Sequence, residues 1–83
     1  MELRELQMEI RNINEMLYQQ NMLGAFPKLG NVLPQLEKYI TELDEDTRDE
    51  WLGILQSALN AMEKQDCTLL ADILEYEVLG RMG

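Results

Sequence analysis

The sequence predicts an all-α protein, an antiparallel four-helix bundle in up-down-up-down order. Large apolar residues recur three and four positions apart along most of the chain, which is the spacing of one helix face. No segment alternates apolar and polar residues with the period of two that is typical of a strand. Short polar breaks divide the chain into four segments, and short links make consecutive helices antiparallel neighbours.

The composition describes one acidic domain that spans residues 1–83 and carries a net charge of −9 with only seven basic residues. Nucleic acids and anionic membranes attract basic surfaces, so neither is an expected partner. No apolar run approaches the roughly 20 residues of a membrane span, and the acidic start does not resemble a signal peptide. A single cysteine cannot form a disulfide within the chain. We therefore expect a cytoplasmic protein.

The first predicted helix covers residues 1–20, and Asn21 follows it as a side chain able to cap the next helix. The apolar stripe of this helix is the narrowest of the four. A three-helix core with a loosely attached first helix is therefore an alternative. The stripe consists of Leu3, Leu6, Ile10, Ile13 and Leu17.

The second segment, residues 22–43, keeps the helical spacing of apolar residues although it contains two prolines. At ~100° per residue, Pro27 and Pro34 fall opposite the apolar seam, where water can replace the hydrogen bond that each proline removes. Gly30, four residues before Pro34, is expected to reduce crowding against the proline ring. We predict one continuous helix that is bent at Pro34. The alternative is two short helices broken at residues 30–31.

The third predicted helix starts at Thr47 or its neighbour, because Thr47 and Glu50 match the capping box in which the two side chains bond each other's backbone amides. It ends near Lys64. Trp51 lies in its first turns on the apolar side, and we expect this residue to anchor the core.

The fourth predicted helix begins after Asp66, a suitable N-cap, and runs to about Leu79. Gly80 is expected to end it. The run LLADILEYE, residues 69–77, resembles the C-terminal helix of small uncharacterised helical-bundle proteins of Gram-positive bacteria. The likeness is strongest over residues 66–78. The resemblance implies a bacterial cytoplasmic bundle, and no activity that can be carried over to particular residues.

Catalytic equipment is not visible in the sequence. Histidine is absent, so no imidazole base is available. Ser57, the only serine, falls on a polar helix face, and the winding places Cys67 on an apolar side as a small buried residue. The acidic residues before the third helix do not match a calcium-binding loop, and their charge instead favours a helix start at this point. We expect no enzyme, no cofactor and no metal.

The last helix carries more apolar surface than one corner of a monomeric bundle requires. At ~100° per residue, its apolar residues sweep an arc about 220° wide. We expect the surplus to contact a second copy of the chain in a two-fold homodimer, through Ala71, Leu74 and Val78. Glu77 falls inside this arc, and we expect it to reach water and pair with Arg81.

Two functional classes are consistent with these observations. The first is a protein–protein interaction module that self-associates or holds a partner helix, as a small chaperone does. The second is a small-molecule- or metal-binding regulator that uses carboxylates, for which Glu77 is the candidate. The surplus apolar surface of the last helix and the lack of catalytic groups favour the first class.

Overall fold

The computed structural model describes residues 2–82 and is all-α, as the sequence predicts. It contains four helices and, within this range, no strand. The fourth helix is continuous but changes its hydrogen-bond pattern twice, and residues 67–82 together are called the C-terminal segment. The elements are α1 (Leu3–Tyr18), α2 (Met22–Thr41), α3 (Glu45–Glu63), α4 (Cys67–Asp72), the π-helix η1 (Ile73–Leu79) and α5 (Gly80–Met82).

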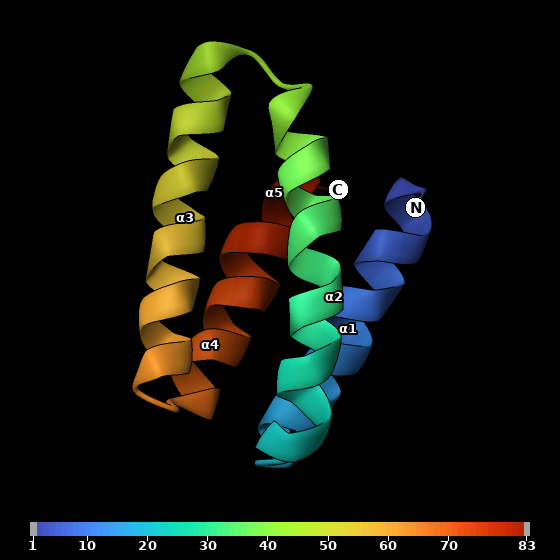
Figure 1. Ribbon diagram of the computed structural model, residues 1–83, viewed down its shortest axis with the longest axis vertical. Coiled ribbons are helices and arrows are strands. Elements are labelled where there is room, and N and C mark those ends of the chain that lie inside the picture. Colours follow the sequence, from blue (N-terminus) through green and yellow to red (C-terminus); the bar gives the residue numbers. More distant parts are fainter. Residues whose placement is uncertain (1, 83) are drawn as a thin grey trace.

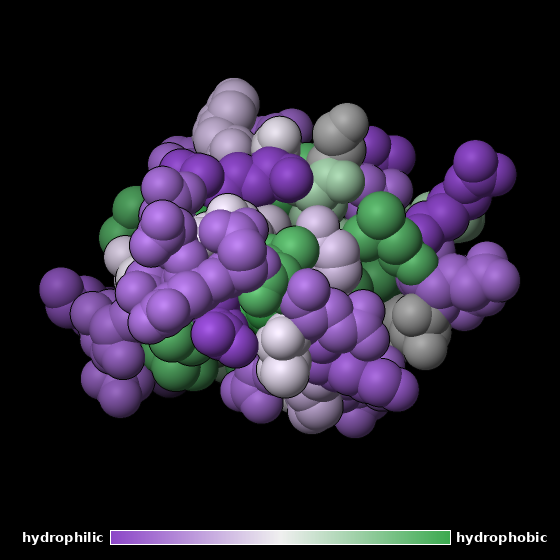
Figure 2. All heavy atoms as spheres, turned by 90° about the horizontal axis from the view of Figure 1, so that it is seen from above, coloured by the Kyte–Doolittle hydropathy of each residue, from purple (hydrophilic) through white to green (hydrophobic). Residues whose placement is uncertain are grey.

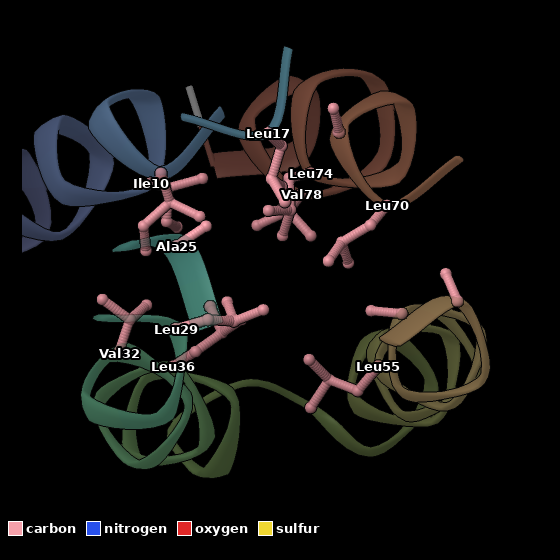
Figure 3. Close-up of a cluster of buried hydrophobic side chains, with 14 of the residues drawn as sticks. Ile10, Leu17, Ala25, Leu29, Val32, Leu36, Leu55, Leu70, Leu74 and Val78 are labelled. Atoms are coloured by element: carbon pink, nitrogen blue, oxygen red, sulfur yellow. The ribbon is translucent and has the colours of Figure 1, made fainter. Parts of the chain in front are cut away.

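The helices surround one shared apolar core (Figure 3), to which every helical segment contributes. α1 packs against both α2 and the C-terminal segment, and α3 packs against the C-terminal segment. α2 and α3 lie on the same side of the molecule in Figure 1, joined by the link at the top, but their contact is far smaller than that of α1 with α2. Within residues 2–82, every helix is too short or too polar to span a lipid bilayer.

The first and third links use the same local structure. Gln20 and Gln65 adopt left-handed backbone conformations, with φ of 61° and 54°, and so end α1 and α3. The next residue in each link caps the following helix: Asn21 Oδ1 accepts from the Gly24 amide at 3.0 Å, and Asp66 Oδ1 accepts from the Leu69 amide at 3.1 Å. Both predicted caps are confirmed.

The predicted start of the third helix is wrong by two residues. α3 begins at Glu45, and its cap is Asp44, whose Oδ2 accepts from the Thr47 amide at 3.3 Å. Hydrogen bonding to Thr47 lowers the pKa of Asp44. A carboxylate is a strong N-cap because it accepts from the first turn and its charge complements the positive end of the helix. The aspartate therefore displaces the capping box that Thr47 and Glu50 would form.

α2 runs without interruption through Pro27 and Pro34, so the predicted continuous helix is confirmed and the two-helix alternative is wrong. Both prolines are exposed, as the winding predicts. The role expected for Gly30 is not supported, because a Cβ built at this position would meet no atom within 4 Å, the Pro34 ring included.

Trp51 is 2% exposed, which confirms its predicted place in the core. Its ring meets the ring of Tyr39 edge-on, with centroids 5.9 Å apart and planes at 86°. This geometry is favourable for aromatic pairs, because the positive edge of one ring meets the negative face of the other. The pair links α3 to α2 near the end where the two helices are joined.

The C-terminal segment differs most from its predicted form. Gly80 does not end it, since the helix continues through Met82, whose side chain is buried. Residues 73–79 form a π-helix, in which each amide bonds five residues back and each turn holds more residues than in an α-helix. Positions four apart therefore stay on one face. The buried residues with this spacing are Leu70, Leu74, Val78 and Met82.

Candidate functional site

The predicted dimer contact does not lie on the surface. Ala71, Leu74 and Val78 are each at most 2% exposed and belong to the core shared by all four helices (Figure 3). A second copy could reach them only if the bundle opened, so the choice of these residues is corrected. A dimer would have to form through a different surface of the bundle.

The π-helix explains this error. The arc of about 220° comes from winding the segment at ~100° per residue, which holds for an α-helix. A π-helix turns through a smaller angle at each residue. Past Asp72, the apolar residues therefore gather into a narrower stripe, which the core of one chain can cover. The surplus is reduced to Leu69 and Tyr76, which are exposed.

Incompletely covered apolar side chains occur elsewhere, and two on α3 lie seven residues apart. Leu52 is 53% exposed and Leu59 is 42% exposed. Figure 2 views the molecule end-on and shows hydrophobic residues (green) between hydrophilic ones (purple). The exposed large apolar residues are Leu3, Met8, Tyr18, Leu23, Leu52, Leu59, Leu69 and Tyr76.

Leu52 and Leu59 of α3 face the boundary between α3 and α2, which is called the seam. Wound at ~100° per residue, Leu52 and Leu59 fall on one flank of α3, with Trp51 turned to the core. Ile54 and Ala61 fall on the other flank and line a groove beside the C-terminal segment. α3 packs against that segment with one flank and adjoins α2 with the other, so the flank of Leu52 and Leu59 is directed toward α2.

α2 completes this face from the other side of the seam. Ala25 and Val32 are buried on the flank that packs against α1, where Figure 3 shows Ala25 next to Ile10. Phe26 and Leu33 fall on the opposite flank and are half-buried against the core. We call the four residues that border the seam the α2–α3 face: Phe26, Leu33, Leu52 and Leu59.

The charged residues beside the α2–α3 face are mainly acidic. By the same winding, Glu37 of α2 and both Glu45 and Glu63 of α3 fall on the flanks that border it, and all three are exposed. Arg48 is the one basic residue on these flanks. The net charge beside the α2–α3 face is therefore negative, like the net charge of −9 of the whole chain.

The groove on the other side of α3 has a volume of about 780 Å³ and a mixed lining. Ile73 and Ala61 supply apolar surface, and Ser57 and Asn60 supply polar groups. The Ser57 hydroxyl donates to the carbonyl of Gly53 at 3.2 Å and is exposed, so the structure gives it the solvent-facing position that the sequence predicts.

Arg81 crosses one end of this groove and forms two ion pairs. Its Nη1 lies 2.9 Å from Glu50 Oε2, and its Nε lies 3.7 Å from Glu77 Oε2. The predicted pairing of Glu77 with Arg81 is confirmed, and Glu77 is exposed rather than buried. The contact with Glu50 was not predicted, because nothing in the sequence indicates which α3 residue the chain end reaches.

Cys67 and the acidic residues near the start of α3 are the other candidates for chemistry in the sequence, and each has a structural role. Cys67 is a buried free thiol, as predicted. Among residues 2–82, no three acidic, cysteine or histidine side chains gather closely enough to hold a metal ion. The acidic residues near the start of α3 instead include its cap, Asp44, and two first-turn acids, Glu45 and Asp46.

A hydrogen bond between Tyr18 and Glu75 joins α1 to η1. The phenol donates to Glu75 Oε2 at 2.7 Å, and this bond, with the nearby negative charge, raises the pKa of Tyr18 from 10.0 to about 12. The folded protein holds this proton more tightly than the unfolded chain does. The stabilisation from this bond is therefore complete below pH 10 and is lost as the pH rises toward 12.

We expect Glu75→Gln to lower the pKa of Tyr18 toward its ordinary value, because an amide oxygen accepts the phenol proton more weakly than a carboxylate. Site-resolved NMR of the tyrosine Cζ carbons during a pH titration measures this directly. Glu77→Gln, which removes a neighbouring charge without touching the phenol, is the control. An unchanged Tyr18 pKa in Glu75→Gln would contradict the assigned bond.

Comparison of the chain with protein-family models, with curated proteins and with solved structures found no match. The resemblance of residues 66–78 to small bundles of Gram-positive bacteria therefore stays a prediction.

Proposed function

We propose that this protein is an interaction module whose α2–α3 face holds an amphipathic helix of a partner protein. The observation that carries the proposal is the incomplete coverage of the four apolar residues bordering the seam. A helix laid along this seam would cover Leu52 and Leu59 and complete the burial of Phe26 and Leu33. Binding of an amphipathic helix in an apolar groove is a common mode of recognition.

The acidic residues beside the α2–α3 face favour a different protein over a second copy of the chain as the partner. Glu37, Glu45 and Glu63 border the face, and two such faces would bring like charges together in a dimer. A partner helix with lysine or arginine beside its apolar stripe would meet these carboxylates instead. The proposed partner is therefore a basic amphipathic helix. If the chain instead self-associates through the same face, a second copy of the chain replaces the basic helix as the partner.

The proposal includes an architecture and a location. The helices form an antiparallel up-down-up-down bundle, which the short links at residues 19–21, 42–44 and 64–66 support. α2 bends at Pro34, since an exposed proline removes a hydrogen bond on the solvent side. The protein acts in the cytoplasm of a bacterial cell, where a free thiol such as Cys67 remains reduced.

Charge-introducing substitutions test the face. We expect Leu52→Glu or Leu59→Glu to weaken binding of a synthetic basic amphipathic helix by at least about tenfold, since one lost apolar contact and an added buried charge exceed about 1.4 kcal/mol. Stability should change little, because both leucines are substantially exposed. Calorimetric titration measures the affinity, and thermal unfolding measures the stability.

Leu69→Glu is the matched control, with the same exchange at a leucine that is 45% exposed but lines the groove on the other side of α3. It should bind the peptide as the parent does. A peptide of identical composition, scrambled so that its leucines share no face, should bind weakly to every variant. Equal loss in all three variants, each of which carries one more negative charge than the parent, would show that the loss is not specific to the α2–α3 face and would overturn the proposed face.

A further inference from the structure

Gly30 is an exposed residue in the middle of α2, and neither its backbone nor its neighbours among residues 2–82 require a glycine there. Its φ is not positive, so the position does not use the conformational freedom of glycine. A Cβ would meet no atom within 4 Å, so the position does not need a small residue for packing. Because glycine makes a helix less stable than alanine does, we looked for a contact outside the chain that would explain it.

The two prolines of α2 leave two backbone carbonyls without their helical donors. In an α-helix each carbonyl accepts from the amide four residues ahead, and proline has no amide hydrogen. Pro27 therefore removes the donor of the Leu23 carbonyl, and Pro34 removes the donor of the Gly30 carbonyl. Leu23 is 93% exposed and Gly30 is exposed, so water can reach both carbonyls in the free protein.

These carbonyls belong to a row of acceptors along one flank of α2. Leu23, Gly30 and Glu37 follow one another at intervals of seven residues, which is about 10.5 Å along a helix. At ~100° per residue, Gly30 falls about 40° beyond Phe26 on the side away from the core, and Glu37 falls between these two. The row therefore runs beside the α2–α3 face. We call the Leu23 and Gly30 carbonyls and the Glu37 carboxylate the acceptor row.

A helix that covers the α2–α3 face would displace water from the acceptor row. A carbonyl that loses water and gains no donor is unfavourable, so the partner must supply N–H groups. Lysine and arginine side chains supply them, and their charge also suits Glu37. Two helices packed side by side have the same rise per residue, so basic residues seven apart on the partner would meet successive acceptors. The missing side chain at Gly30 leaves its carbonyl open to such a group.

We propose that the partner helix carries a basic residue at every seventh position and that these residues donate to the acceptor row. The proposal rests on the proposed function, because it names the sequence pattern of the helix that the α2–α3 face holds. It also gives the prolines of α2 a role in recognition. Pro27 and Pro34 keep two carbonyls free for the partner, although each proline makes the helix less stable.

The test is a thermodynamic cycle between the chain and a synthetic helical peptide with leucines on one face and lysines at every seventh position beside it. Trimethylation of the lysines keeps their charge and removes their N–H donors. We expect it to weaken binding to the parent by about a hundredfold, since each of the two carbonyl contacts is worth about tenfold. In the Pro27→Ala/Pro34→Ala variant, the alanine amides occupy both carbonyls. Only the loss at the exposed Glu37 should then remain, about fivefold or less.

The proline variant should also unfold at a higher temperature than the parent, because alanine restores both hydrogen bonds within α2. A merely structural role of the prolines would change this temperature without changing the effect of trimethylation. Gly53→Ala is the control for added helix stability. Gly53 is an exposed glycine of α3 whose Cβ would likewise meet no atom within 4 Å, and its substitution does not touch the acceptor row. This variant should keep the full loss on trimethylation.

Two results would contradict the acceptor row, and one of them leaves the α2–α3 face intact. If binding depends on Leu52 and Leu59 but trimethylation weakens it equally in the parent and in the proline variant, the acceptor row is wrong and the face stands. A peptide that does not bind the parent, or that binds Leu52→Glu as tightly as the parent, would overturn both the acceptor row and the proposed function.

Discussion

Trp51→Ala is expected to lower the free energy of unfolding by about 3–5 kcal/mol, the usual cost of removing a large buried aromatic side chain. Trp51 fills the core between α3 and α2 and contacts Tyr39 edge-on, so alanine would leave a cavity and an unpaired ring. The free energy of unfolding of a domain of this size is about 4–12 kcal/mol in total. The variant should therefore lose between about a quarter and all of the stability of the parent, which urea denaturation would show as a lower midpoint.

Leu52→Ala is the control for this prediction. The residue is adjacent in sequence but 53% exposed, so its truncation should cost about 1 kcal/mol or less. A Trp51→Ala protein as stable as Leu52→Ala would contradict the position of Trp51 in the core.

Val78→Glu is the second substitution with a large expected effect. If Val78 lay in a dimer contact, this change would separate two folded chains. Val78 is instead 0% exposed, so the change places a carboxylate among apolar side chains, at a cost of several kcal/mol. We expect loss of the helical signal in circular dichroism at neutral pH, with partial recovery in mild acid as the carboxyl group is protonated.

Tyr76→Glu introduces the same charge two residues earlier, at a position that is 70% exposed. It should keep the helical signal of the parent. A Val78→Glu protein that remained fully helical while its mass halved would restore the dimer contact through Val78 and contradict the packing of η1.

The parts of the fold that could be predicted from the sequence are governed by local chemistry. Asn21 and Asp66 cap helices because their side-chain oxygens reach amides only three residues ahead. Pro27 and Pro34 interrupt neither α2 nor its apolar seam, because both lie on the solvent side. Neighbouring residues contain all the information that these features require.

The features that could not be predicted depend on competition between alternative caps or on contacts between distant parts of the chain. Asp44 and Thr47 are both plausible caps, and only the folded chain shows that the carboxylate is used. The π-helix has no recognised sequence signal here, although the spacing of four from Leu70 to Met82 is consistent with it. By winding, Asn14 falls just outside the apolar stripe of α1, beside Leu3, and the lack of a donor for its buried amide oxygen appears only in three dimensions.

The most direct test of the proposed function is methyl NMR of the chain during titration with the basic amphipathic peptide. The methyl signals of Leu52, Leu59 and Leu33 should shift together and saturate at one peptide per chain, while those of Leu69 stay in place. Sedimentation of the free protein should give a mass near 9.7 kDa. Shifts centred on Leu69, or a free protein of twice that mass whose Leu52 and Leu59 methyl groups are already protected, would contradict the α2–α3 face as the site of a partner helix.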